Sequence, residues 1–187
     1  EQAEVGEHRE AIYAVEVPEH QGSIHDFVLA LEDHNITEFN YRGTDNSSAN
    51  VFVGLTVTPS SNDVAELTQK LSQSGYQALD LTDNEMAKLH VRYMIGGSQP
   101  GSGSDERVFR VEFPERPGAL MKFLDALGDG FNISMFHYRN HGAAYGRILV
   151  GFTGSAAYSA ALRETLDRVG FRYWEESDNP AYRAYLQ

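Results

Sequence analysis

The chain has 187 residues, of which 41% are hydrophobic and 22% are charged, with a formal net charge of -12 at pH 7 and no cysteine. This length suits one ordinary domain or two small ones, and the composition is that of a folded globular protein. The negative charge disfavours nucleic acid and anionic membrane surfaces as partners. No apolar run approaches the roughly 20 residues that span a bilayer, and the lack of cysteine excludes disulfides, zinc fingers and thiol nucleophiles.

The beginning of the chain carries no targeting signal, because no charged and then apolar segment opens it. The cytoplasm is therefore the expected location. The first residue is Glu1 rather than Met, which suggests a processed product or a piece of a longer protein.

The first half of the chain contains six predicted elements when its apolar periodicity is followed. In order, these are a strand over 11–17, a helix from Ile24 to Leu31, strand-like runs over 36–42 and 50–57, a helix over 62–74 and a strand over 76–81. Pro18 ends the first strand, and Gly75 stands in the usual cap position after the second helix. Turn-forming residues between the two central runs predict a hairpin.

A connector follows these elements. "TDNEMAKL" at 82–89 has the spacing of a capping box from Thr82 to Glu85, which predicts a short extra helix. "GGSQPGSGSDE" at 96–106 predicts a flexible linker. It lacks the lysine and the flanking strand and helix of a phosphate-binding loop.

The second half of the chain repeats the first. "EFNYR" at 38 returns as "MFHYR" at 135, an offset of 97, and "PEHQG" at 18 returns as "PERPG" at 114, an offset of 96, so one residue is inserted between these anchors. The predicted elements recur as a strand over 107–113, a helix over 120–127, strands over 133–139 and 146–153, a helix over 155–169 that ends at Gly170, and a strand over 171–175. A repeat of nearly half the chain indicates a duplicated domain.

The predicted fold class is α+β, with tandem ferredoxin-like units of β-α-β-β-α-β order, each an antiparallel sheet with helices on one face. We place the first unit and its connector at 1–95, the linker at 96–106 and the second unit at 107–187. Each unit leaves sheet edges and a sheet face to be covered. We therefore expect the units to cover each other or another copy of the chain, and we expect a homo-oligomer, either a dimer or a tetramer.

No catalytic constellation and no metal site is predicted. His137 and His141 are four residues apart, but on a strand and its turn they do not share a helical face. The chain has no GxSxG motif, and its carboxylates are typical of a solvated surface.

The Pro-Glu-x-x-Gly turn before each first helix is a candidate binding feature. Gly22 and Gly118 stand where a strand passes into a helix, so the free N–H groups of the helix end can hold a carboxylate. The alternative is that both glycines only permit a tight turn.

The repeated Tyr-Arg pairs, Tyr41 with Arg42 and Tyr138 with Arg139, are a second candidate feature. A tyrosine beside an arginine in both copies, near a possible anion site, favours an amino acid as the ligand. The alternative is that these residues serve strand packing. Neighbouring residues on a strand face opposite sides of the sheet, and a tyrosine at the edge of the core can bury its ring while its hydroxyl reaches solvent.

Three segments resemble one protein family. "FPERPGALMKFLDALG" and "NISMFHYRNHGAAYGRILVGF" within 113–152, "EFNYR" at 38–42 and "DNEMAKLHVRYMIGG" at 83–97 closely resemble the carboxy-terminal regulatory region of biosynthetic threonine deaminase (threonine ammonia-lyase), over residues 5–187. The resemblance implies paired ACT-like domains that bind isoleucine as inhibitor and valine as its antagonist. It also implies a catalytic domain in the same polypeptide.

The same resemblance implies which residues of this chain bind the effectors, and that the cofactor is held by the catalytic domain. The effector sites would centre on Tyr41 and Arg42 in one copy and on Tyr138 and Arg139 in the other, with support from Arg92. "EHQGS" in the first copy departs from the more ACT-typical "ERPGA" of the second, so the two sites need not be equivalent. Pyridoxal phosphate belongs to the family's catalytic domain, and we expect no cofactor and no enzyme activity in this chain alone.

Other interpretations stay open. The chain could be a stand-alone ACT-like binding protein for another amino acid, or a structural oligomerisation module. A ligand-dependent change in stability separates binding from a purely structural role. An RNA-binding ferredoxin-like domain is opposed by the acidity and by the missing aromatic-basic strand signature.

Overall fold

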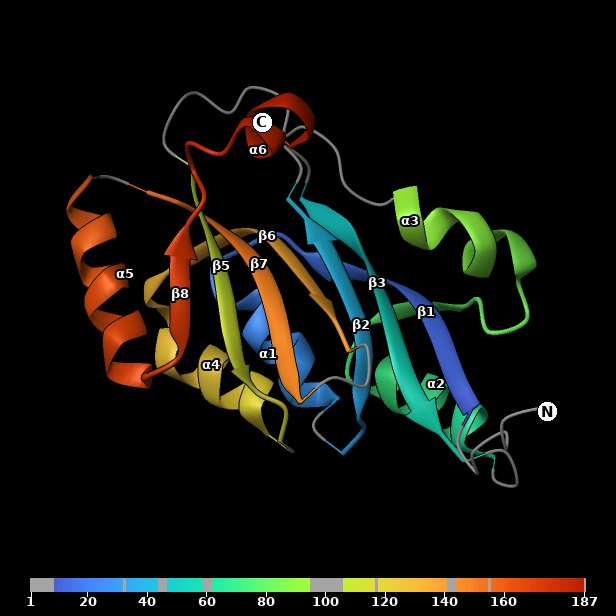
Figure 1. Ribbon diagram of the computed structural model, residues 1–187. Helices are drawn as coiled ribbons and strands as arrows, with labels where there is room; N and C mark the ends of the chain where they lie inside the picture. Colours follow the sequence, from blue (N-terminus) through green and yellow to red (C-terminus); the bar gives the residue numbers. More distant parts are fainter. Residues whose placement is uncertain are drawn as a thin grey trace.

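The computed structural model describes residues 9–31, 33–43, 47–58, 62–94, 106–116, 118–140, 144–154 and 156–186. They form two β-α-β-β-α-β units in succession, each followed by a short helix (Figure 1). The first unit comprises β1 (Arg9–Pro18), α1 (Ser23–Ala30), β2 (Ile36–Arg42), β3 (Ser48–Val57), α2 (Asp63–Gln73) and β4 (Gln77–Asp80). The second comprises β5 (Glu106–Pro114), α4 (Ala119–Leu127), η2 (Gly128–Gly130), β6 (Asn132–Arg139), β7 (Tyr145–Thr153), α5 (Ala156–Val169) and β8 (Arg172–Glu175).

All eight strands belong to one antiparallel sheet in the order β4-β1-β3-β2-β6-β7-β5-β8. The predicted α+β class with tandem ferredoxin-like units is therefore confirmed. The two units join edge to edge where β2 pairs with β6, and we name this pair the seam. Its register sets Phe39 opposite Tyr138, Asn40 opposite His137 and Tyr41 opposite Phe136. In the repeat, Phe39 corresponds to Phe136 and Tyr41 to Tyr138, so each pair across the seam has an equivalent pair with the two units exchanged. An approximate two-fold axis therefore passes through the seam.

One face of the sheet is covered by α1, α2, α4 and α5, and we name it the main helix face. These helices bury apolar residues at helical spacing, and one continuous apolar core runs beneath them across both units. At the seam this core holds Phe39 and Phe136, both fully buried, with ring centroids 5.6 Å apart in an edge arrangement. The two units therefore share a single core.

Two glycines predicted as helix caps are confirmed in that role. Gly75 and Gly170 follow α2 and α5 with φ values of 86° and 76°, the left-handed region in which glycine ends a helix without a Cβ clash.

The opposite face of the sheet carries two smaller apolar clusters, each covered by a short helix, and we name it the short-helix face. In the first unit a helical turn at 85–86 leads into η1 (Ala87–Val91), which continues into α3 (Arg92–Met94). Together, over 85–94, they form the connector helix. It packs Ala87 on Ile12 and Phe52. In the second unit α6 (Pro180–Tyr185) packs Tyr182 on Val108 and Met135. Figure 1 shows these helices near the ends of the central strands.

The short helices differ from the sequence prediction. The expected helix over 82–89 begins and ends later, at 85–94, and the predicted capping box from Thr82 to Glu85 is wrong. The Thr82 hydroxyl accepts a hydrogen bond from the Ile12 N–H, while the side chain of Asn84 accepts one from the N–H of Ala87 and caps the helix. Sequence reasoning did not predict α6.

The predicted linker over 96–106 lies outside the described residues except for Glu106, which begins β5. The domain boundaries stay a prediction. Within the described part of the chain, every helix is too short or too polar to cross a bilayer.

Candidate functional site

The strand alternation separates each Tyr-Arg pair. Tyr41 and Tyr138 lie in the core of the main helix face, whereas Arg42 and Arg139 extend over the short-helix face. The structure therefore does not bring each tyrosine and its neighbouring arginine into one site.

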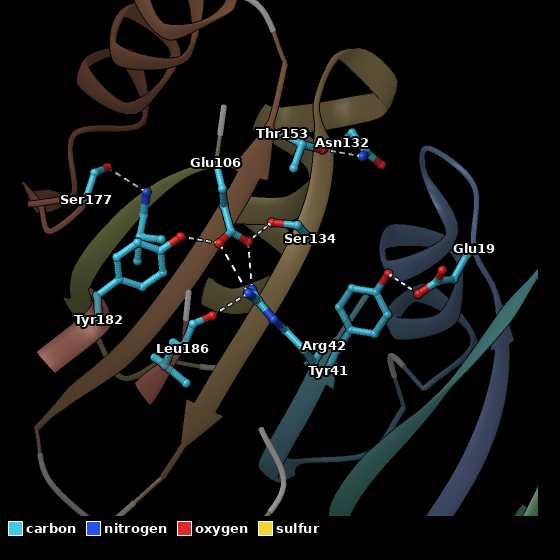
Figure 2. A network of polar contacts seen from close by, with 11 residues as sticks. Glu19, Tyr41, Arg42, Glu106, Asn132, Ser134, Thr153, Ser177, Tyr182 and Leu186 are labelled. Carbon is cyan, nitrogen blue, oxygen red and sulfur yellow. Dashed lines mark hydrogen bonds and ion pairs between the residues drawn. The ribbon is translucent and has the colours of Figure 1, made fainter. Parts of the chain in front are cut away.

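Arg42 holds the two units together on the short-helix face. Its guanidinium donates to Glu106 Oε1 of the second unit at 2.6 Å and to the carbonyl of Leu186 at 2.6 Å. Glu106 also accepts hydrogen bonds from Ser134 and Tyr182. Figure 2 shows Arg42 reaching toward Glu106 while Tyr41 points away toward Glu19. The side chains of Arg42 and Glu106 are only 9% and 4% exposed, so this pair is buried.

The remaining predicted arginines also lie on the short-helix face. Arg92 of the connector helix donates to Glu38 at 2.6 Å and to Glu10 at 3.0 Å. Burial alone would lower the pKa of Arg92, but these carboxylates raise it overall, so it stays charged. The guanidinium of Arg139 lies over the ring of Tyr93, 5.2 Å from its centroid. None of the three arginines lines the cavities described next.

Gly118 and Tyr138, in contrast, line the same cavity, which we name the seam pocket. Its volume is about 420 Å³, within the range of about 300 to 1,000 Å³ usual for small-molecule sites. The second unit contributes Glu115, Arg116, Gly118, Leu120, Met121, Tyr138 and Asn140, and the first unit contributes Val28, Leu31, Asp33, His34, Asn35 and Ile36. The pocket therefore has one wall from each unit.

Polar chemistry in the seam pocket centres on Glu115. Its Oε1 accepts a hydrogen bond of 3.0 Å from the Tyr138 hydroxyl. Burial, and then the charge of Glu115, raises the pKa of Tyr138, which keeps the phenol protonated and donating. Glu115 Oε2 and His34 Nδ1 are buried side-chain atoms that find no hydrogen-bond partner among the described residues. Since an unpaired buried polar atom costs about 1 to 3 kcal/mol, this pocket favours a polar ligand that can pair with its walls.

His34 is neutral at the edge of this pocket. Burial is the main cause that lowers the pKa of its imidazole, and the charge of Lys70 adds to it. Of the two carboxylates in the seam pocket, Asp33 is exposed and paired with Lys70 at 2.8 Å, so Glu115 is the one available to a ligand. Sequence reasoning missed Glu115 and His34 as site residues, although the repeated Pro-Glu-x-x-Gly turn contained the signal for Glu115.

Gly22 and Tyr41 line the equivalent cavity of the first unit, which we name the closed pocket. It offers only about 10 Å³. Tyr41 donates to Glu19 at 3.4 Å, as Tyr138 donates to Glu115, so the polar pair is repeated. What differs is the filling of the space: both pockets have an equivalent leucine and isoleucine, but the closed pocket has Phe131 where the seam pocket has His34 and Asn35.

A histidine bridges the two units beside the closed pocket. Nε2 of His25 on α1 lies 2.9 Å from the carboxylate of Asp125 on α4, and Nδ1 lies 3.3 Å from Asp26. The hydrogen bond to Asp125 is the main cause that raises the pKa of His25. The stabilisation is therefore fully present below the unfolded pKa of about 6.5 and is lost as the pH rises through the higher folded value.

We expect the NMR titration of His25 to give a pKa above 6.5, and the substitution Asp125→Asn to move it down. Asp26→Asn is the matched control, since Asp26 is the weaker contact and should change the pKa less. Equal changes from both substitutions would contradict the bridge between the units.

The residues of both pockets do not fit a Schiff-base cofactor. The chain has three lysines, Lys70, Lys88 and Lys122, and none of them lines either pocket. Lys70 pairs with Asp33 at 2.8 Å, and Lys122 lies over the ring of Phe171. No step through pyridoxal phosphate can be derived for these pockets.

Two ferredoxin-like units that share one sheet and enclose a ligand-sized pocket at the glycine turn of one unit define a protein of paired ACT-like domains. Comparison with known families narrows the class. The chain belongs to the family of the C-terminal regulatory domain of threonine dehydratase, whose model matches residues 1–91 and 98–186. Threonine dehydratase is another name for threonine deaminase, so the resemblance found in the sequence is confirmed.

Curated relatives agree with this family. The chain is 49% identical to the biosynthetic L-threonine dehydratase IlvA of Burkholderia multivorans. It is 46% and 45% identical to the corresponding proteins of Salmonella typhimurium and Escherichia coli. Each match covers 100% of this chain and 36% of the relative. The chain thus spans about a third of the length of these relatives.

Proposed function

We propose that the chain is the effector-binding part of a cytoplasmic, pyridoxal-phosphate-dependent threonine dehydratase, and that isoleucine and valine bind in the seam pocket. The observation that carries this proposal is the pocket itself, which combines a carboxylate, a helix N-terminus and an apolar wall. The cofactor belongs to the catalytic domain of the same polypeptide, which this chain regulates.

The pocket has a partner for each group of a branched aliphatic amino acid. The ligand ammonium pairs with Glu115, and the ligand carboxylate lies at the turn of Gly118, where α4 begins. Gly118 has a φ of 80°, and apart from its chain neighbours no described residue lies within 4 Å of the place where a Cβ would stand. The aliphatic tip packs on Val28, Leu31 and Ile36 of the other unit. Arg42, Arg92 and Arg139 act in the fold rather than on the ligand.

Binding across the two units explains how a small ligand regulates a large protein. A ligand that touches both walls favours one relative position of the units, and a coupling of about 1 to 3 kcal/mol suffices for allosteric control. Isoleucine and valine differ by one methylene, worth about 1 to 3 kcal/mol in a fitted pocket. Valine therefore competes for the pocket without stabilising the same arrangement equally.

Calorimetry should detect isoleucine binding, and Glu115→Gln should weaken it roughly 10- to 100-fold, because a hydrogen bond to a charged group is worth about 1.5 to 3 kcal/mol. Valine should compete with isoleucine, and threonine should bind more weakly because its hydroxyl meets the apolar wall.

Glu19→Gln is the matched control, since Glu19 holds the same position beside the closed pocket. It should leave the affinity for isoleucine unchanged. If isoleucine does not bind, or if both substitutions weaken it equally, the assignment to the seam pocket is wrong.

The proposal includes a homo-oligomer. On the connector helix, Met86, Leu89 and Tyr93 follow a spacing of three and four residues and are 62 to 64% exposed. In the second unit the repeat has alanines at the equivalent positions of α6, Ala181 for Met86 and Ala184 for Leu89. The large exposed side chains at these positions are therefore a feature of the connector helix. Such apolar exposure favours coverage by another chain or by the catalytic domain.

A further inference from the structure

The two pockets differ in one feature that packing of the core does not require. A Cβ placed on Gly118 would meet no described residue within 4 Å beyond its chain neighbours, whereas a Cβ placed on Gly22 would lie 2.8 Å from Oδ1 of Asp129. The space beside the first glycine turn is thus occupied by a carboxylate from the second unit. At the same turn, the Gln21 side chain donates a hydrogen bond to the main-chain oxygen of Asp129.

The inserted residue of the repeat accounts for this difference. Leu31 and Ile36 of the first unit correspond to Leu127 and Ile133 of the second, so four residues separate the first pair and five separate the second. The longer segment forms the η2 turn, Gly128–Gly130, directly after α4. This turn carries Asp129 across the seam to Gly22.

We propose that the η2 turn, with Asp129 at its centre, is an internal plug that occupies a second amino-acid site at Gly22, Tyr41 and Glu19. The inference rests on the proposed function for the identity of the ligand. The carboxylate of Asp129 lies beside Gly22, which corresponds to the place proposed for the ligand carboxylate at Gly118, and Tyr41 and Glu19 repeat the pair that Tyr138 and Glu115 form.

The η2 turn itself is held by surface contacts, whereas Phe131, the next residue after it, is buried in the core. Asp129 is exposed, its main-chain oxygen accepts the hydrogen bond from Gln21, and its carboxylate lies beside Gly22. Exposed polar contacts of this kind add little to stability. Removing them therefore releases the turn without unfolding the shared core.

The variant Gln21→Ala/Asp129→Ala tests the plug. At isoleucine concentrations that saturate the seam pocket, calorimetry should give one ligand per parent chain and two per variant chain. Adding Glu19→Gln to the variant should remove the gained site, and Glu164→Ala, an exposed acidic residue of α5 that lines neither pocket, should leave one site.

A second measurement needs no ligand. The Gly22 amide resonance should shift on Asp129→Ala, because the substitution removes the carboxylate that lies beside this glycine, and Glu164→Ala should leave the resonance in place. Two equal sites in the parent, or one site in the variant, would overturn the plug, and so would an unchanged Gly22 resonance. If isoleucine binds neither protein but Gly22 senses Asp129, the proposed ligand is wrong and the plug stands.

Discussion

Replacing Arg42 by alanine should lower the free energy of unfolding by about 3 to 5 kcal/mol, because it leaves the Glu106 carboxylate buried without its counter-charge. The loss also frees the carbonyl of Leu186 and with it the end of α6. A typical domain is stable by only about 5 to 15 kcal/mol, so urea denaturation should show the effect as a large shift of the midpoint.

The repeat supplies the control for this experiment. Arg139 occupies the equivalent position in the second unit, but its guanidinium lies over the exposed ring of Tyr93. Arg139→Ala should cost about 0.5 to 1 kcal/mol. Equal losses from the two substitutions would show that the Arg42–Glu106 pair does not hold the units together.

Replacing Phe39 by alanine should destabilise the protein by about 3 to 5 kcal/mol, the usual cost of deleting a fully buried aromatic ring. Phe39 also contacts Phe27, with ring centroids 5.9 Å apart, so the cavity would open under α1 as well as at the seam. Thermal or urea unfolding followed by circular dichroism measures the loss.

A double-mutant cycle tests whether Phe39 couples the two units. With the milder changes Phe39→Leu and Phe136→Leu, the coupling energy should be about 0.5 to 1.5 kcal/mol, the value of an aromatic pair beyond its burial. Phe109→Leu, which lies in the second unit next to Phe152 and Tyr173, is the comparison and should be additive with Phe39→Leu. Additivity at the seam would mean that the cores act independently.

The order of helices and strands was predictable because it depends on local apolar periodicity. The duplication helped, because the same pattern in both halves supports the assignment in each. The repeat also held a signal that we did not use: "TDN" at 82 returns as "SDN" at 177. Asn179 caps α6 just as Asn84 caps the connector helix, each through a side chain that accepts a backbone N–H bond. A second short helix could have been predicted from this match.

The site was only partly predictable, because it depends on contacts between the units. Strand alternation already placed Tyr138 and Arg139 on opposite faces, but only the pairing of β2 with β6 shows that Arg42 reaches Glu106. The size of each pocket depends on one inserted residue and on where its turn lies. Such tertiary contacts leave no periodic pattern in the sequence.

The approximate two-fold axis at the seam has a consequence for how such a protein can evolve. In a symmetric dimer of separate chains, every mutation appears at both copies of a site, so the two pockets must open and close alike. Here the halves are covalently joined and encoded separately, and a single insertion near Gly130 affects one pocket alone. Fusion thus lets selection change one pocket of the pair while the other keeps its shape.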